Sequence, residues 1–156
     1  MLDIIDSKIL DILQHEGRIT NAELAQRIGL TPGPVLTRVS KLESAGFIQR
    51  YVAVVDRSAL GLGVTAFVSV ILKEHDRRSS EVFTKAVGAI PQVLECHHIA
   101  GDEDYLLKVV ASSPVDYERV ILDEISSIKG VQRVKTTFVL STTKDETYIP
   151  VREVTS

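Results

Sequence analysis

The sequence predicts an α+β protein in two parts, a small helical domain followed by a larger domain of strands and helices. Three observations support this. Apolar residues in the first 45 positions recur at helical spacing, whereas later segments read as strands alternating with helices. Between them lies LGLG, residues 60–63, which suits a flexible boundary. We therefore place one domain at 1–51, a hinge strand or linker at 52–62, and a second domain at 63–156.

Three short helices are expected in the first domain. Gly17 ends the first, a Thr20–Glu23 capping-box pattern starts the second, Gly29 closes it, and Gly46 ends the third. The expected core-facing residues are Leu2, Ile5, Ile9 and Ile12 in the first helix, Leu24, Ala25 and Ile28 in the second, and Val35, Val39 and Leu42 in the third. This arrangement is typical of a helix-turn-helix domain.

The start of the third helix is ambiguous in the stretch TPGPV, residues 31–35. In one alternative Thr31 caps the helix through the Gly33 N–H, and Pro32 takes the first position, where a missing N–H costs nothing. In the other, the helix begins at Gly33 with Pro34 first. The sequence leaves both open.

The second domain follows a β-like stretch at 47–55. It predicts strands at 64–72, 93–100, 104–111 and 131–141, with one helix ending before Pro91 and another from Pro114 to Gly130. The stripe of this last helix is Tyr117, Ile121, Ile125 and Ile128. Only GDE separates the middle strands, which predicts a hairpin. The order β-α-β-β-α-β is that of the ferredoxin-like fold.

The strand at 64–72 is apolar on both faces. Val64, Ala66, Val68 and Val70 share one face, and Phe67 and Ile71 share the other. Two helices cover only one face of such a sheet, so the second apolar face needs a partner. We therefore expect an obligate homodimer.

Composition indicates an ordinary globular protein, with 44% hydrophobic and 25% charged residues. No apolar run is long enough for a membrane span, and the N-terminus lacks the basic region of a secretory signal. The single cysteine, Cys96, fits a reducing cytosol. The net charge is −3, yet residues 18–51 hold five basic and two acidic side chains, a local +3 that leaves −6 elsewhere. This split suggests two tasks.

Three stretches carry a family resemblance: residues 2–36, RVSKLESAGFI at 38–48, and AGDEDYLL at 100–107. Together they resemble the leucine-responsive/AsnC family of transcription regulators, also called feast/famine regulators. The last stretch is similar to the family's Gly-Asp-x-Asp-Tyr signature and is the most specific. The resemblance implies a (winged) helix-turn-helix, a hinge, and a ferredoxin-like domain that senses small molecules. It also implies dimers that assemble into octamers or other closed rings, with amino acids as effectors.

The second helix of a helix-turn-helix pair enters the major groove of double-stranded DNA. Because Val35, Val39 and Leu42 face the core, we expect Thr37, Arg38 and Lys41 to contact DNA, with Thr31 and Gly33 at the helix edge. Many relatives resemble this stretch but carry Ser or Thr where Gly33 stands, so contacts at that edge are expected to differ. The candidate phosphate partners are Arg18, Arg27 and Arg50.

An amino-acid effector is a zwitterion, whose pocket needs acceptors for the ammonium group and donors for the carboxylate. Asp102 and Asp104 supply acceptors, and Gly101 permits close backbone approach. The strand VKTTFVL supplies two hydroxyls and an apolar wall. The resemblance places effector-responsive positions at Asp104, Thr137, Phe138 and Val139; the full predicted set adds Gly101, Asp102 and Thr136.

Rival interpretations are an enzyme and a metal- or redox-responsive regulator of the same architecture. The sequence shows neither a nucleophile–base pair nor a phosphate-binding glycine loop, which argues against an enzyme. Cys96 and His98 share a strand face, but two ligands make a poor metal site. A metal-responsive regulator could also use His15, His75 or His97, and metal analysis of the purified protein separates it from an amino-acid sensor. We therefore expect a cytoplasmic, nucleoid-associated regulator without metal or cofactor, responsive to an amino acid.

Overall fold

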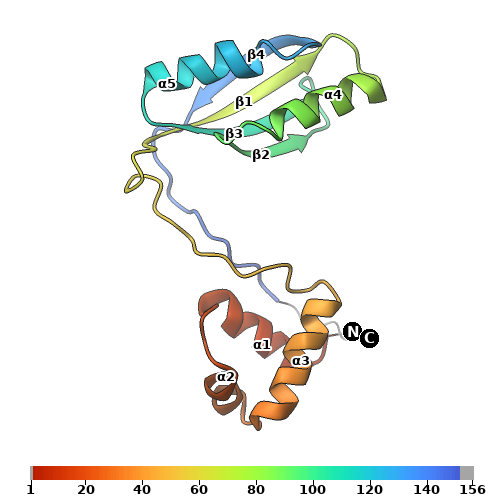
Figure 1. The fold of residues 1–156 in the computed structure, drawn as a ribbon, viewed down its shortest axis with the longest axis vertical. Coiled ribbons are helices and arrows are strands. Elements are labelled where there is room, and N and C mark those ends of the chain that lie inside the picture. Colours follow the sequence, from red (N-terminus) through yellow and green to blue (C-terminus); the bar gives the residue numbers. More distant parts are fainter. Residues whose placement is uncertain (1, 152–156) are drawn as a thin grey trace. The chain divides into compact units, whose positions relative to one another are not determined.

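The structure of the protein, a computed structural model, describes residues 2–151. The chain divides into two compact units, shown in Figure 1. The first comprises Met1–Val54 together with Lys144–Ser156, and the second comprises Val55–Thr143. The described C-terminal residues, 144–151, therefore pack with the helical unit, whereas the sequence analysis placed them with the sheet. Residues 152–156 of that expected domain lie outside the described part.

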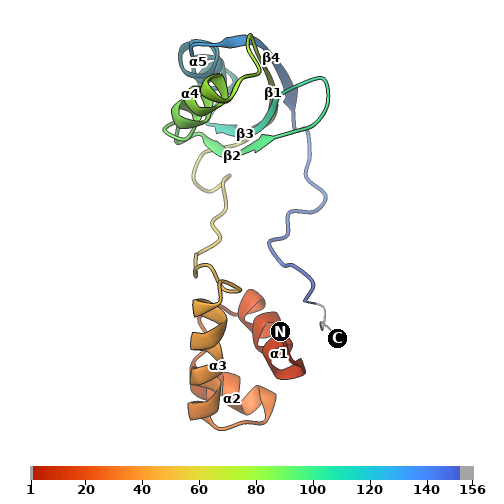
Figure 2. The same cartoon turned by 90° about the vertical axis from the view of Figure 1, so that its right-hand side faces the viewer.

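The first unit contains the three expected helices, α1 (Ile4–His15), α2 (Asn21–Ile28) and α3 (Pro32–Ser44), seen clearly in Figure 2. The Thr20–Glu23 capping box is present, and Gly29 closes α2 with a φ of 74°, in the left-handed region that glycine favours. The buried core residues of this unit are Ile9, Leu24, Ala25, Val35, Val39 and Leu42.

The two prolines of TPGPV now have a structural explanation. Helix α3 begins at Pro32, with Thr31 in an extended conformation as the N-cap. The first alternative is therefore correct for the helix start but not for the hydrogen bond, because the Thr31 side chain makes no capping contact. A β-carbon added at Gly33 would meet no atom within 4 Å.

The β-like stretch at 47–55 does not form a strand within this chain. Its side chains are exposed, with Val52 at 67%, Val54 at 77% and Val55 at 60%. A strand exists only when its backbone groups pair with a neighbour, and no described segment provides one for this stretch.

The second unit is a four-stranded antiparallel sheet with order β2-β3-β1-β4. Its strands are β1 (Val64–Leu72), β2 (Val93–His98), β3 (Tyr105–Ala111) and β4 (Val131–Phe138). The expected hairpin is confirmed by the antiparallel pairing of β2 with β3. With α4 (Arg77–Val87) and α5 (Pro114–Arg119) between the strands, this is the expected βαββαβ order, and the α+β fold class is confirmed.

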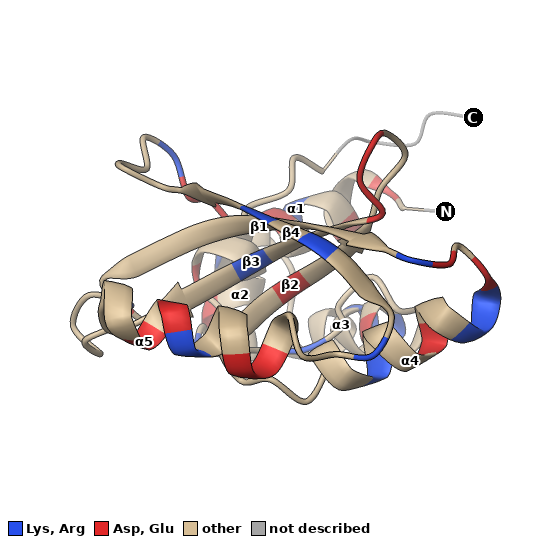
Figure 3. Cartoon of the chain, turned by 90° about the horizontal axis from the view of Figure 1, so that it is seen from above, with Lys and Arg blue, Asp and Glu red and all other residues tan. Residues whose placement is uncertain are grey.

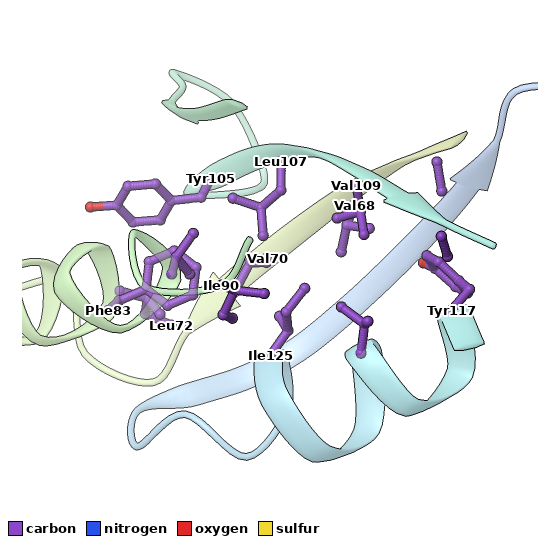
Figure 4. Close-up of a cluster of buried hydrophobic side chains, with 14 residues drawn as sticks. Val68, Val70, Leu72, Phe83, Ile90, Tyr105, Leu107, Val109, Tyr117 and Ile125 are labelled. Carbon is purple, nitrogen blue, oxygen red and sulfur yellow. The ribbon is translucent and has the colours of Figure 1, made fainter. Parts of the chain in front are cut away.

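Helices α4 and α5 cover one face of this sheet (Figure 1). Alternate residues of β1, including Ala66, Val68 and Val70, point into the core with exposures of 0%. Figure 4 shows Val68 and Val70 in one cluster with Phe83 of α4 and with Tyr105 and Leu107 of β3. The opposite face carries Phe67, which is 37% exposed.

The last helix keeps the predicted stripe but not a regular α-helical pattern of hydrogen bonds. After α5 the chain forms a π-helix, η1 (Val120–Ile125), in which the Ser126 N–H donates to the Ile121 carbonyl. Tyr117 and Ile125 are buried, and Ile121 and Ile128 pack against the core as partly buried residues, so the predicted stripe is confirmed. Val120, three residues after Tyr117, is buried on the same face and adds to it. No helix in residues 2–151 is long and apolar enough to cross a membrane.

Candidate nucleic-acid interface and ligand site

The outward face of α3 is set by its three buried residues, Val35, Val39 and Leu42. Thr31, Gly33, Thr37 and Lys41 are all exposed, as predicted from helical spacing. The Thr37 hydroxyl donates to the Gly33 carbonyl at 3.2 Å, so it is held against the first turn of the helix.

Arg38 points toward α1. Its Nη1 lies 2.6 Å from Asp3 Oδ2 and 2.6 Å from Asp6 Oδ1. Asp6 is only 5% exposed, and these two acids form the capping box of α1. The hydrogen bond from the Asp6 backbone N–H, and then Arg38, lower the pKa of Asp3. Its two carboxylate partners raise the pKa of Arg38. Arg38 therefore fixes α3 against the start of α1.

The predicted phosphate partners differ in their surroundings. Arg27 makes a two-pronged contact with Glu16, which raises the pKa of the guanidinium. Arg18, Lys41 and Arg50 are exposed and have no ion-pair partner within residues 2–151. Arg27 and Arg38 thus bind carboxylates of the same unit, and DNA contact at any of these cations stays a prediction.

Asp104 is held at the junction of β3 with β1 and the loop that follows β1. Its backbone N–H donates to the Val70 carbonyl. One carboxylate oxygen accepts from the Leu72 N–H at 2.8 Å, and the other lies 2.8 Å from His75 Nδ1. The carboxylate therefore has a fixed position, with 21% of the side chain still exposed.

A cavity of about 320 Å³ opens beside this carboxylate. Asp76 and Asp104 supply acceptors, while Arg77 and Ser80 supply donors, so both signs needed by a zwitterion are present. The complete lining is Leu72, His75, Asp76, Arg77, Ser80, His98, Asp104 and Tyr105. Sequence reasoning missed the contribution of residues 75–80, although Asp76, whose side chain caps α4, carried a recognisable N-cap signal.

The hairpin residues Gly101 and Asp102 are exposed next to Asp104. The β4 candidates lie elsewhere. Thr137 pairs with Phe67 in the middle of β1, and the Val139 N–H donates to the Thr65 carbonyl near its start. At roughly 3.3 Å per residue, these positions are well over 10 Å from Asp104, at the other end of β1.

Within β4 the candidates also face opposite ways. Thr136 and Phe138 point to the helix side, where Tyr117 lies 2.6 Å from the Thr136 hydroxyl and its ring packs edge-on against Phe138. Thr137 points to the open face of the sheet. One chain therefore does not bring Asp104 and the β4 group into a single pocket.

The rival metal or redox site gains no support from the geometry. Cys96 is exposed on β2, and desolvation raises the pKa of its thiol, opposite to what a reactive thiolate needs. His98 stacks on Tyr105 with ring centroids 5.0 Å apart, while His97 approaches Glu95. Within residues 2–151 no group of three or more His, Cys, Asp or Glu side chains is placed to hold a metal ion.

Charge on the open face of the sheet is organised in pairs. Lys108 of β3 lies 3.1 Å from Glu95 of β2, visible in Figure 3 as a basic band beside an acidic one. Lys135 of β4 lies 3.6 Å from Glu103. These pairs frame the apolar residues of β1 on that face.

Comparison with known proteins follows the same division. Residues 2–49 match the family model of a winged helix-turn-helix DNA-binding domain, and residues 65–149 match that of the Lrp/AsnC ligand binding domain. The chain is 37% identical over 150 residues to a leucine-responsive regulatory protein of Rhizobium meliloti (strain 1021), covering 96% of each. It is 35% identical over 154 residues to the transcriptional regulator AzlB of Bacillus subtilis (strain 168), covering 99% of this chain and 98% of that protein.

A solved structure gives the same result. That of a transcriptional regulator from Neisseria meningitidis in complex with L-methionine superimposes with a TM-score of 0.92 and 37% sequence identity. The match covers 96% of this chain and 97% of that one.

Proposed function

Since the chain belongs to the Lrp/AsnC family of transcriptional regulators, and is therefore a DNA-binding regulator with a ligand-binding domain, we propose that its effector is an α-amino acid. The similar regulator from Neisseria meningitidis was crystallised with L-methionine, which supports this class of ligand. The relatives of this chain named above are transcriptional regulators, and the chain is a regulator rather than an enzyme.

The observation that carries the proposal is the fixed carboxylate of Asp104. It borders a cavity of about 320 Å³ that also offers the donors Arg77 and Ser80. An ammonium group binding Asp104 would make a charge-assisted hydrogen bond, one of the stronger kinds in proteins. Gly101 and Asp102, exposed on the same hairpin, complete the candidate acceptor side.

The pocket is completed by a second subunit. Asp104 lies near the end of β1, on its β3 side, whereas Thr136, Thr137, Phe138 and Val139 lie on its β4 side, opposite residues 65–68. Contact between two subunits would bring both groups to one ligand. Phe138 is 49% exposed and can supply the apolar wall. Such a site makes the effector a regulator of assembly.

Self-association through the open sheet face supplies those subunits. Helices cover the other face only, and Phe67 is left 37% exposed among framing ion pairs. We infer a dimer through this face, with dimers joining into an octamer or another closed ring.

On the DNA side, Thr37 and Lys41 meet the operator, with Thr31 and Gly33 at the leading edge of α3 and Arg18 and Arg50 on phosphates. Arg27 and Arg38 act by holding the helices in place, because Glu16, Asp3 and Asp6 already bind them. Bound to operators, the protein is associated with the nucleoid in the cytoplasm.

Effector binding then changes DNA binding by favouring one assembly or one placement of the DNA-binding units. This is allosteric coupling, since the favoured assembly must bind both ligands differently from its alternative.

A thermal-shift screen over the twenty amino acids tests the effector, because a ligand that binds only the folded state raises its melting temperature. We expect a subset to stabilise the protein, and Asp104→Asn to weaken that ligand's affinity about tenfold or more. Asp123→Asn, which neutralises an exposed acid outside the cavity lining, is the control. No shift with any amino acid would contradict the proposal.

The DNA face is tested by Lys41→Met in a binding titration at several salt concentrations. Losing one phosphate contact should weaken binding and reduce the slope of log affinity against log salt by about 1. An unchanged slope and affinity would remove Lys41 from the interface.

A further inference from the structure

The C-terminal segment, residues 139–151, follows β4. Its Tyr148 and Ile149 contact α1 inside the first unit. The Gln14 side-chain amide donates from Nε2 to the Ile149 carbonyl at 3.0 Å and accepts from the Ile149 N–H at 2.8 Å. The Gln14 side chain thus pairs with both the N–H and the carbonyl of Ile149, as a residue of a neighbouring β-strand would.

Tyr148 adds a second point of attachment. Its hydroxyl donates to Asp11 Oδ1 at 2.9 Å, and its ring lies against His15 with centroids 4.7 Å apart. The His15 Nδ1 lies 2.8 Å from the Asp11 carbonyl, which fixes the orientation of the ring.

The three α1 residues form one continuous surface, which we call the α1 outer face: Asp11, Gln14 and His15. They follow the i, i+3, i+4 spacing of a single helix face, and all three are exposed, whereas Ile9 of the same helix is buried in the core. The outer face is thus free of any role in core packing. Its contact also leaves Thr37 and Lys41 of α3 exposed.

The docked segment gives the DNA-binding unit a second connection to the sheet. The first is the chain between Ser44 and Val64, which contains the unpaired stretch 47–55. The second runs from Phe138, the end of β4, to Tyr148, ten residues on, and spans at most about 35 Å when extended. With a single connection the unit would be held only by a long irregular segment.

We propose that the α1 outer face is a docking surface for the C-terminal segment of this chain, and that docking restricts the DNA-binding unit so that it engages operators in a preferred placement. A contact of a few exposed hydrogen bonds is weak between separate molecules. Attachment through a short linker raises the local concentration of the segment to the order of millimolar, so even a weak contact is populated. Because the contact is weak, a small conformational change elsewhere in the chain can release the segment from α1.

The segment begins where β4 ends, next to the candidate effector residues Thr137, Phe138 and Val139. A change at this end of β4 therefore reaches α1 through ten residues of chain. This last link rests on the proposed effector function, whereas the docking itself does not.

The contact is tested first without DNA or effector, by hydrogen exchange of the Ile149 amide in the full-length protein. Gln14→Ala should accelerate exchange at Ile149 about tenfold, since it removes that amide's acceptor, while amides inside α1 keep their protection. Thr142→Ala, an exposed change in the same segment, is the control. Equal exchange in Gln14→Ala and the unchanged protein would overturn the docking.

The consequence is tested by operator affinity. Gln14→Ala and Tyr148→Phe should each weaken operator binding about three- to tenfold, because an unrestricted unit must be ordered on binding. Thr142→Ala should have no effect. Full operator affinity in a Gln14→Ala protein with a fast-exchanging Ile149 would overturn the restricting role. If amino acids fail to stabilise the protein, the proposed effector is wrong, but the exchange and affinity results still decide on the docking.

Discussion

The two units of this protein are held together by different physical means. The sheet unit has a core of fourteen buried residues. Within residues 2–54 and 144–151, the helical unit has an apolar core of only six buried residues, and a partly buried ionic contact, Arg38 with Asp3 and Asp6, joins two of its helices. Small domains bury a smaller fraction of their surface, so each remaining contact matters more. Helix α3 is thus held partly by charge, whereas the sheet is held by apolar packing.

The strongest test of this contrast removes packing from the sheet unit. Phe83→Ala should lower its free energy of unfolding by roughly 3–5 kcal/mol, because Phe83 is 0% exposed and packs on Tyr105. Urea unfolding followed by circular dichroism measures the loss. Val82→Ala, at the neighbouring exposed position, should cost less than about 1 kcal/mol. Equal losses in the two variants would contradict the assigned core.

Removing the ionic contact should affect the helical unit next most strongly. Breaking a buried ion pair costs about 3–5 kcal/mol, but the Arg38 side chain is 31% exposed, so we expect about 2–3 kcal/mol for Arg38→Met. Arg18→Met, at an exposed cation, should change stability by less than about 0.5 kcal/mol. Calorimetry of both variants measures this. An Arg38→Met protein of full stability that no longer binds DNA would instead assign Arg38 to DNA contact, as its helical spacing predicts.

Lowering the pH should weaken the ion pair between Asp3 and Arg38. The pKa of Asp3 is lowered from its ordinary 3.8 by the capping hydrogen bond and Arg38. A lowered pKa means that Asp3 stabilises the folded unit fully above pH 3.8 and loses that effect as the pH falls through the lower, folded-state value. Since Asp3 is half exposed, Asp3→Asn should cost about 1 kcal/mol above this range and little below it. Melting temperatures across this range measure it; a pH-independent loss would exclude the mechanism.

The smallest effect compares two N-cap threonines within the helical unit. Thr20 accepts from the Glu23 N–H, so Thr20→Ala should cost about 1 kcal/mol. Thr31 makes no capping bond, so Thr31→Ala should leave stability unchanged within about 0.5 kcal/mol. Thermal unfolding distinguishes them. A loss of operator affinity in Thr31→Ala alone would assign Thr31 to DNA contact, and equal destabilisation would show that it caps α3 in solution.

Local patterns in the sequence predicted most of the fold. The capping box at Thr20, the left-handed Gly29, the limits of β1 and the β2–β3 hairpin each depend on residues close together in the chain. The π-helical turn was not predicted because the apolar stripe fits an α-helix equally well, whereas the turn shows only in the backbone hydrogen bonds.

The candidate sites were harder to predict because their contacts join distant residues. Arg38 had the right spacing to face outward, but its partners stand 35 and 32 positions away, and no periodicity reports them. Gln14 and Ile149 are 135 positions apart. Asp104 was found from its motif, whereas the side chains of residues 75–80 that share its cavity were not.

The open space around Gly33 has a consequence for how such regulators diversify. Glycine is among the poorest helix formers, and a side chain added here meets no neighbour within 4 Å. A single codon change to serine would place a hydroxyl at the leading edge of α3 while leaving every contact that holds the helix intact. Two gene copies with this fold and the same effector could therefore acquire separate sets of target promoters without either copy first losing stability.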